Sequence, residues 1–149
     1  MRAVVQRALR ARVEIAEEIV GSIERGLVAF VGAAEGDTEE DLAYVVNKVV
    51  GLRVFHDDMG RMSRAIDDIG GELLVVSQFT VFGDVRRGLR PSFDGAMEPE
   101  AAERLYDRFV EACQTRGARV ATGRFRADMR VTVENDGPVT ILVDSRRMF

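Results

Sequence analysis

Polar side chains that could do chemistry gather at two places in this 149-residue sequence. The first place is Ser77-Gln78-Phe79-Thr80, which directly follows the apolar run Leu73-Leu74-Val75-Val76. Such a run is typical of a buried strand, and binding sites are often built where a strand ends. The alternative is that Ser77 and Thr80 only terminate the strand by hydrogen bonding to its backbone. The residue types alone leave both interpretations open.

The second place is the pair Gly137-Pro138, which lies between two apolar segments, Val131-Thr132-Val133 and Val139-Thr140-Ile141-Leu142-Val143. Both segments are typical of strands. Proline removes a hydrogen bond from a strand pair and glycine weakens a strand, so sheet stability does not account for this pair. Roughly 5–6% of X-Pro bonds in folded proteins are cis, which makes a trans turn between two strands the default interpretation.

Strands that could position these residues are indicated by alternation near the start of the chain. The residues that share one face of a two-residue period are Ala3, Val5, Arg7, Val13, Ile15 and Ile19. They predict a hairpin or a meander. The continuous apolar run over residues 27–31 is short enough to be a further, buried strand.

Two amphipathic helices are predicted from apolar residues at helical spacing. The first spans about residues 38–52, and Asp37 with Glu40 three residues later predicts its capping pair. The second has Pro99 in its first turn and Gly117 at its end. Its apolar stripe comprises Ala102, Leu105, Tyr106, Phe109, Val110 and Cys113.

The composition fits one globular domain over residues 1–149, with 46% hydrophobic and 31% charged residues. The strands and helices predict the α+β class: a β-rich, barrel-like curved sheet with two packed amphipathic helices. No apolar run approaches the ~20 residues that cross a bilayer, and no signal peptide is visible, so we expect a cytoplasmic protein without membrane contact. The single Cys113 and the single His56 cannot form an intrachain disulfide or a Cys/His cluster, so neither a metal nor a cofactor is expected.

Local charge differs from the total charge, which is −4 with a pI near 5.1. The total argues against a protein coated by nucleic acid. Arginines nevertheless gather in two stretches: Arg86, Arg87 and Arg90, and then Arg116, Arg119, Arg124, Arg126 and Arg130. Those at positions 86, 87, 90, 124 and 126 could form a basic site that neutralises phosphates, because phosphate contacts depend on local charge. The alternative is a solvated basic face.

Two signatures occur together in this chain, Ser77-Gln78-Phe79-Thr80 and Asn135-Asp136-Gly137-Pro138-Val139-Thr140. Further matching segments are Gln6-Arg7, Gly88-Leu89-Arg90-Pro91-Ser92-Phe93, Leu105-Tyr106, Phe109-Val110, Thr122-Gly123-Arg124-Phe125 and Ala127-Asp128-Met129. In this order the set resembles the D-aminoacyl-tRNA deacylases over nearly the whole chain, which is far more specific than one short motif. The chain departs from the family at Arg61-Met62-Ser63, where Lys-Met-Asn is common.

The resemblance implies a homodimeric hydrolase that cleaves the ester bond of D-aminoacyl-tRNA. In the family the Gly-Pro peptide is cis and projects from one subunit into the pocket of the other. Carried over, Gly137 and Pro138 of one copy would meet Ser77–Thr80 of its partner as a side-chain-free wall. An L-amino acid's side chain collides with such a wall, whereas that of a D-amino acid does not. Glycine has no side chain to collide, so we also expect hydrolysis of glycyl-tRNA.

The resemblance also assigns the site residues. The catalytic segment is Ser77, Gln78, Phe79 and Thr80, and the substrate-binding residues are Gly137, Pro138, Phe125, Met129 and Arg7. Thr80 as nucleophile lacks a histidine or lysine motif to activate it. The favoured alternative is the 2′-hydroxyl of the terminal adenosine of tRNA, with main-chain amides near Phe79 and Thr80 stabilising the oxyanion. Phe79 either stacks on the terminal adenine or belongs to the core, and Phe125 and Met129 either line the pocket or belong to the core.

Two other functions fit parts of the sequence. A module that binds tRNA or another nucleic acid without cleaving it would need a basic surface, which the acidic pI does not favour. A general Ser- or Thr-dependent esterase would cleave small D-amino acid esters that lack a nucleotide. Neither alternative explains why Ser77–Thr80 and Gly137-Pro138 occur together.

Overall fold

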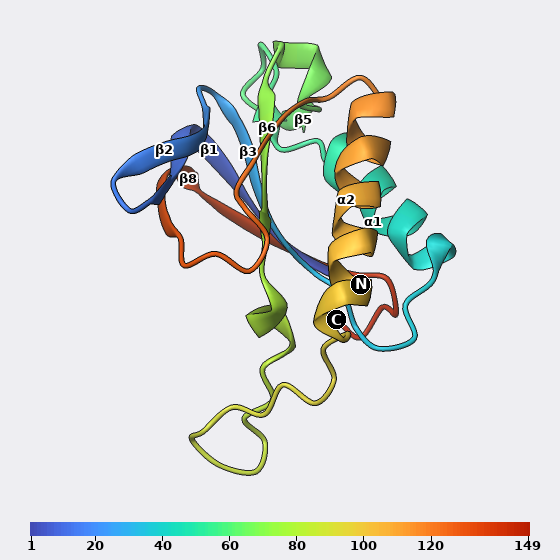
Figure 1. Ribbon diagram of the computed structural model, residues 1–149. Helices are drawn as coiled ribbons and strands as arrows, with labels where there is room; N and C mark the ends of the chain where they lie inside the picture. The colour runs from blue at the N-terminus through green and yellow to red at the C-terminus, as the bar shows by residue number, and fades with distance from the viewer.

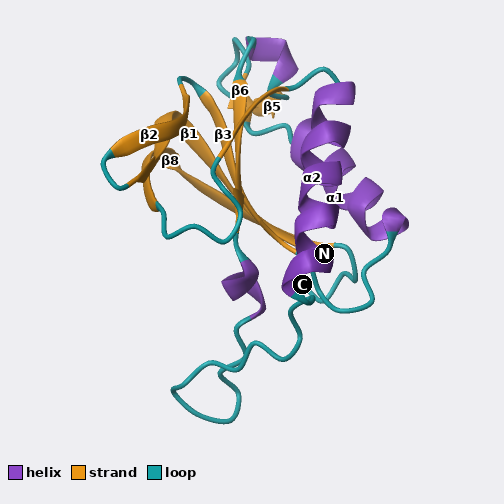
Figure 2. Cartoon of the chain, viewed as in Figure 1, coloured by secondary structure: helices purple, strands orange, loops and turns teal.

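The computed structural model describes residues 1–149 and shows a strongly curved sheet beside a pair of helices (Figure 1). The strands are β1 (Arg2–Ile15), β2 (Glu18–Ile23), β3 (Gly26–Gly32), β4 (Phe55–His56), β5 (Met62–Arg64), β6 (Glu72–Ser77), β7 (Arg119–Thr122) and β8 (Arg130–Asp144). The helices are α1 (Glu39–Gly51) and α2 (Pro99–Thr115), with two short 3₁₀ turns, η1 (Asp67–Ile69) and η2 (Phe79–Phe82). The long loop between η2 and α2 extends away from the rest of the molecule (Figure 2).

β1 is the centre of the sheet because it pairs with three strands, β2, β3 and β8, all antiparallel. β6 and β7 then extend the sheet from β3 in parallel. The two ends of this path approach each other: a Cβ built on Gly21 of β2 would lie 2.2 Å from the carbonyl oxygen of Thr122 in β7. The sheet is therefore nearly closed, and the predicted single α+β domain with a barrel-like sheet and two helices is confirmed.

The buried face of β1 carries the side chains that the two-residue period predicts. Ala3, Val5 and Val13 are at most 1% exposed. Ile19 departs from the pattern at 55% exposed, because the chain reverses at Ala16 and Glu17, both of which have positive φ. β3 and β6 contribute to apolar clusters on both faces of the sheet, which explains why their sequences are continuously apolar.

The capping pair of α1 lies one residue later in the sequence than predicted. Thr38 is the N-cap, and its main-chain N–H and its hydroxyl donate to Asp41 Oδ2 at 2.8 and 3.0 Å. The prediction of Asp37 and Glu40 is therefore wrong by one position, because both pairs have the spacing of a capping box and Asp37 is used elsewhere. The buried face of the helix agrees with the prediction and comprises Leu42, Val45, Val46, Val49 and Val50.

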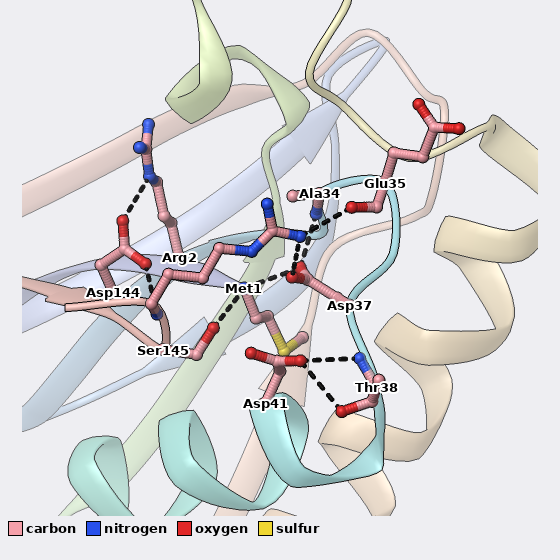
Figure 3. Close-up of polar contacts among 10 residues, drawn as sticks. Met1, Arg2, Ala34, Glu35, Asp37, Thr38, Asp41, Asp144 and Ser145 are labelled. Atoms are coloured by element: carbon pink, nitrogen blue, oxygen red, sulfur yellow. Dashed lines mark hydrogen bonds and ion pairs between the residues drawn. The ribbon is translucent and has the colours of Figure 1, made fainter. Parts of the chain in front are cut away.

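Asp37 ties the start of β1 to the segment that follows β8 (Figure 3). Its carboxylate is 0% exposed and lies 2.6 Å from the Met1 ammonium and 3.0 Å from Arg146 Nη2. A buried carboxylate needs such partners, because an unpaired buried charge is costly. Nearby, a hydrogen bond from Ser145 lowers the pKa of Asp41 to about 2. Ionised Asp41 therefore stabilises the fold above the ordinary carboxyl pKa, and this contribution is lost as the pH falls through about 2.

α2 packs its predicted apolar stripe against the rest of the core. Glu98 is the N-cap, with Oε2 accepting from the N–H of Glu100 at 3.1 Å, and Pro99 lies in the first turn as predicted. Gly117 follows the helix with φ +94°, a conformation that favours glycine. Cys113 is 0% exposed, and burial raises the pKa of its thiol to about 12. No helix of the chain is long and apolar enough to cross a membrane.

β8 is one strand where the sequence predicts two. It stays continuous because β1 is long enough to pair with both of its apolar segments, while residues 136–139 bulge out of the pairing opposite Arg7. The peptide bond between Gly137 and Pro138 is cis. The default expectation of a trans turn between two strands is therefore wrong.

Candidate active site

A cavity of about 680 Å³ opens where β3 and β6 end, beside the first turn of α2. Of its 20 lining residues, 14 are hydrophobic, so it suits a largely apolar group. Five of the predicted site residues line it: Ser77, Gln78, Phe79, Phe125 and Met129. The other four, Thr80, Gly137, Pro138 and Arg7, do not.

The segment Ser77–Thr80 reaches the cavity because the chain turns sharply at the end of β6. The N–H of Gln78 donates the last bond to the sheet, to the carbonyl of Val31 at 2.8 Å, and η2 begins at the next residue. η2 then packs directly on β3 at Gly32, where an added Cβ would lie 2.5 Å from Val81 Cγ2. A glycine at the end of an apolar strand was a sequence signal for this close approach.

The main-chain amides of Phe79 and Thr80 begin η2. The first amides of a helical turn have no acceptor within it. The turn and cap hydrogen bonds here are donated by the following residues, Val81 to the carbonyl of Gln78 at 3.4 Å and Gly83 to that of Thr80 at 2.9 Å. The hydroxyl of Thr80 accepts a short hydrogen bond from Gln78 Nε2. No histidine or lysine lines the cavity.

Aromatic rings form much of the cavity wall. Phe79 is 58% exposed and meets Phe93 edge-on, with ring centroids 5.0 Å apart. The interpretation of Phe79 as a core residue is therefore wrong. On the other side, Phe125 lies 5.9 Å from the ring of Tyr106. The exposed ring of Phe79 is therefore the one available to a planar ligand.

Tyr106 is a lining residue that sequence reasoning placed in the α2 stripe and in a segment matching the family, but not in the site. Its hydroxyl donates to the carbonyl of Val75 at 3.0 Å, which ties α2 to β6 just before the signature segment. Burial raises the pKa of Tyr106 above its ordinary value, so the hydroxyl stays a donor. Met97 was also missed, although an apolar side chain within a polar loop was a usable signal. Nothing in the sequence pointed to Met1, whose buried side chain completes the wall.

The Gly137-Pro138 loop lies outside the cavity and is held by Arg7. This arginine is 4% exposed, its Nη1 donates to the carbonyl of Val54 at 2.5 Å, and its Nε lies 3.1 Å from both the carbonyl and the carboxylate of Asp136. A Cβ added to Gly137, at φ +125°, would lie 3.0 Å from Arg7 Nη2. Gly137 and Pro138 are nevertheless exposed. The structure thus brings Arg7 to the loop and not to the cavity.

Comparison with known proteins tests the family membership that the resemblance predicts. The family model described as D-Tyr-tRNA(Tyr) deacylase matches residues 4–144. The chain belongs to the D-Tyr-tRNA(Tyr) deacylase family. The D-aminoacyl-tRNA deacylase of Sorangium cellulosum (strain So ce56) is 71% identical over 150 positions, covering 100% of both chains. That of Thermotoga petrophila (strain ATCC BAA-488 / DSM 13995 / JCM 10881 / RKU-1) is 54% identical over 149 positions, again covering 100% of both.

Solved structures share the deacylase fold. The structure of a c-Myc DNA Unwinding Element Binding Protein has a TM-score of 0.91 at 40% identity, covering 97% of this chain and 98% of that one. The structure of a probable eukaryotic D-amino acid tRNA deacylase has a TM-score of 0.83 at 18% identity, covering 96% and 98%, which shows the fold. Membership of the deacylase family makes this chain a hydrolase of D-aminoacyl-tRNA, as the resemblance predicts. The interpretation as a binding module without hydrolytic activity is therefore set aside.

Proposed function

We propose that this deacylase works as a homodimer, and that Gly137-Pro138 of one copy completes the cavity of the other and excludes L-aminoacyl groups. One observation carries the proposal: the cavity holds Ser77, Gln78 and Phe79, whereas Gly137 and Pro138 are firmly held but exposed outside it. A second copy related by a twofold axis can supply the missing segment to each cavity. Such an enzyme would act in the cytoplasm, where aminoacyl-tRNA is made and used.

The surface around the loop supports association with a second copy. β8 pairs with β1 alone, so its other edge is unpaired. Leu9, Ile141 and Leu142 on these two strands are 46%, 36% and 55% exposed. An unpaired strand edge beside exposed apolar side chains is a favourable surface for pairing with another chain. The loop lies within the same strand, so association there would carry it toward the partner.

Selection by handedness would follow from main-chain geometry. The ammonium and ester groups of the aminoacyl end fix its orientation, so the side chain points either into open space or into the wall made by the partner's loop. Gly137 presents only backbone, and Arg7 and Asp136 hold that backbone in place. The wall rejects the L-form by collision and accepts the D-form. Glycyl-tRNA has nothing to collide, so it is also hydrolysed.

The chemistry we propose is attack of water on the ester carbonyl, with the 2′-hydroxyl of the terminal adenosine assisting. The bond between the acyl carbon and the ribose 3′ oxygen breaks, this oxygen takes up a proton from the attacking water, and the products are the free D-amino acid and tRNA. The amides of Phe79 and Thr80 stabilise the oxyanion, and one such donor contributes about 3 kcal/mol to lowering the barrier. The adenine stacks on Phe79, with Phe125 and Met129 in the same cavity. Thr80 is not the nucleophile, because no histidine or lysine lies at the cavity to take the proton of its hydroxyl.

The decisive experiment compares hydrolysis of matched D-tyrosyl-tRNA and L-tyrosyl-tRNA by the purified protein. We expect cleavage of the D-form and none of the L-form. Glycyl-tRNA should also be cleaved, and D-tyrosyl-tRNA ending in 2′-deoxyadenosine should be a poor substrate. Equal rates for the two hands would overturn the steric wall, and normal cleavage of the 2′-deoxy substrate would overturn the assistance by ribose.

A further inference from the structure

The loop between η2 and α2 forms an arm, residues 83–96, that projects away from the body (Figure 1). Its base is ordered, because Asp84 and Ser92 exchange two main-chain hydrogen bonds of 2.8 and 2.9 Å. Phe93, the next residue, lines the cavity and packs against Phe79. Residues 85–91 at the tip are all exposed. The arm is therefore an extension of the cavity wall into solvent.

The three arginines of the arm differ in their partners. Arg86 is clamped by Asp84, with Nε 2.9 Å from Oδ1 and Nη2 2.7 Å from Oδ2. Arg87 and Arg90 are exposed and have neither an ion pair nor a hydrogen-bond acceptor within the chain. Two unpaired positive charges, three positions apart in the sequence, thus stand on one arm of a protein whose net charge is −4. Charge placed this way directs a polyanion to one side of an acidic body.

We propose that Arg87 and Arg90 bind phosphates of the unpaired nucleotides that lead to the 3′ end of tRNA. The inference rests on the proposed function, which places the terminal adenosine against Phe79. RNA that leaves the cavity carries a phosphate at every nucleotide, and the arm runs outward from that same wall. A guanidinium group matches the geometry of phosphate oxygens and forms two hydrogen bonds to them.

A second copy of the chain is the other conceivable occupant of the arm. Leu89, at the tip, is fully exposed, and burial of this side chain would favour such a contact. Arg87 and Arg90 flank it, however, so a protein contact that buries Leu89 would also bury these two positive charges without a partner. Burying unpaired charges of one sign is costly, whereas phosphates neutralise them. The charges therefore favour RNA.

The test is the salt dependence of kcat/KM for D-tyrosyl-tRNA. In the Arg87→Gln/Arg90→Gln double variant we expect the slope of log kcat/KM against log salt to be shallower by about 1.4, from about 0.7 for each single-strand phosphate. Between 50 and 200 mM salt, the wild type then loses about sevenfold more activity than the double variant. Arg86→Gln should change the slope much less, because this side chain is already paired with Asp84.

Arg53→Gln is the matched control for net charge. Arg53 is exposed and without an ion pair in the segment between α1 and β4, which lies at the end of the molecule opposite the arm (Figure 1). The substitution Arg53→Gln removes the same charge as Arg87→Gln or Arg90→Gln alone. We expect it to leave the slope of log kcat/KM against log salt unchanged. An equal effect of Arg53→Gln and Arg87→Gln would overturn the local contact.

A short substrate separates this inference from the proposed function. The nucleoside ester 3′-D-tyrosyl-adenosine lacks the phosphates that the arm would bind, so the double variant should cleave it at the wild-type rate. Reduced cleavage of this ester, an unchanged salt slope, or a changed molecular mass in sedimentation would overturn the inference. Failure of the wild type to cleave D-tyrosyl-tRNA would instead overturn the proposed function.

Discussion

The cavity and the Gly137-Pro138 loop are both built by main-chain contacts, but they meet solvent in opposite ways. The cavity is concave and closed at its base by packed elements, with η2 pressed onto Gly32 and Tyr106 bonded to Val75. The loop is convex, and its buried support, Arg7, lies behind an exposed tip. The difference teaches that the two signature segments lie apart within one copy of the chain, which is the arrangement that the proposed dimer would complete.

The strongest way to break this comparison is complementation between two inactive variants. Gly137→Ala places a Cβ against Arg7 at positive φ, and Ala96→Trp fills the cavity. We expect each variant alone to lose about a hundredfold in kcat/KM, the cost of a displacement of about 1 Å in a site. An equal mixture, refolded together, should recover about a quarter of wild-type activity, because half of the dimers carry one intact site of two. A mixture that stays inactive would show that each site belongs to one chain.

Removing the support behind the loop tests whether its position is set by Arg7. In Arg7→Ala, Val54 and Asp136 lose a buried partner, so we expect the free energy of unfolding to fall by about 3 kcal/mol. Activity measured well below the lowered melting temperature should fall as well. The control is Arg10→Ala, which breaks an exposed β1–β8 pair with Glu134 and should cost less than about 1 kcal/mol in urea unfolding. Equal losses would mean that burial of Arg7 adds nothing.

A change confined to the cavity sharpens the comparison from the other side. Phe79→Ala removes an exposed ring, so the free energy of unfolding should be nearly unaffected. Its kcat/KM should fall about 5- to 150-fold, because stacking on adenine contributes about 1–3 kcal/mol. Phe79→Tyr keeps the ring and should keep most of the activity. If both variants behave alike in the tRNA assay, stacking is not the role of this side chain.

The smallest expected effect is that of Thr80→Ala. Its hydroxyl lies outside the cavity lining and accepts from Gln78, so we expect single-turnover rates on D-tyrosyl-tRNA to change by less than about threefold. The main-chain amide of residue 80, which we propose stabilises the oxyanion, survives the substitution. A loss of about 10⁴-fold would restore Thr80 as the nucleophile.

Sequence reasoning predicts the fold well where one periodicity decides the structure. The apolar faces of α1 and α2 and the buried runs of β3 and β6 follow from spacing alone. It fails where two interpretations share one pattern, because Asp37-Glu40 and Thr38-Asp41 both fit a capping box. Asp37 turns inward because the Met1 ammonium and Arg146, which come from the two ends of the chain, pair with it. Long-range partners of this kind are not encoded in local sequence.

The site could likewise be predicted only where the local sequence pattern decides the structure. Ser77, Gln78 and Phe79 lie at the cavity because a strand must end where its apolar run ends. Arg7 could be grouped with the site by resemblance, but its contacts with Val54 and Asp136 join segments far apart in sequence. The sequence predicts that Gly137-Pro138 separates two strands. In the structure β1 is long enough to pair with the residues on both sides of it, so they form one strand. That length is a property of the partner strand and not of the segment itself.

The burial of Cys113 makes the thiol of the folded protein unreactive. Reagents such as maleimides attack the thiolate, which a pKa of about 12 and complete enclosure by α2 and its neighbours make scarce and inaccessible. A cysteine introduced at Leu89, at the arm tip, would therefore be the single labelling position in the native molecule. A fluorophore or spin label attached there would report on docking of nucleic acid. Labelling of Cys113 would measure the fraction of molecules in which α2 and its neighbours have unfolded.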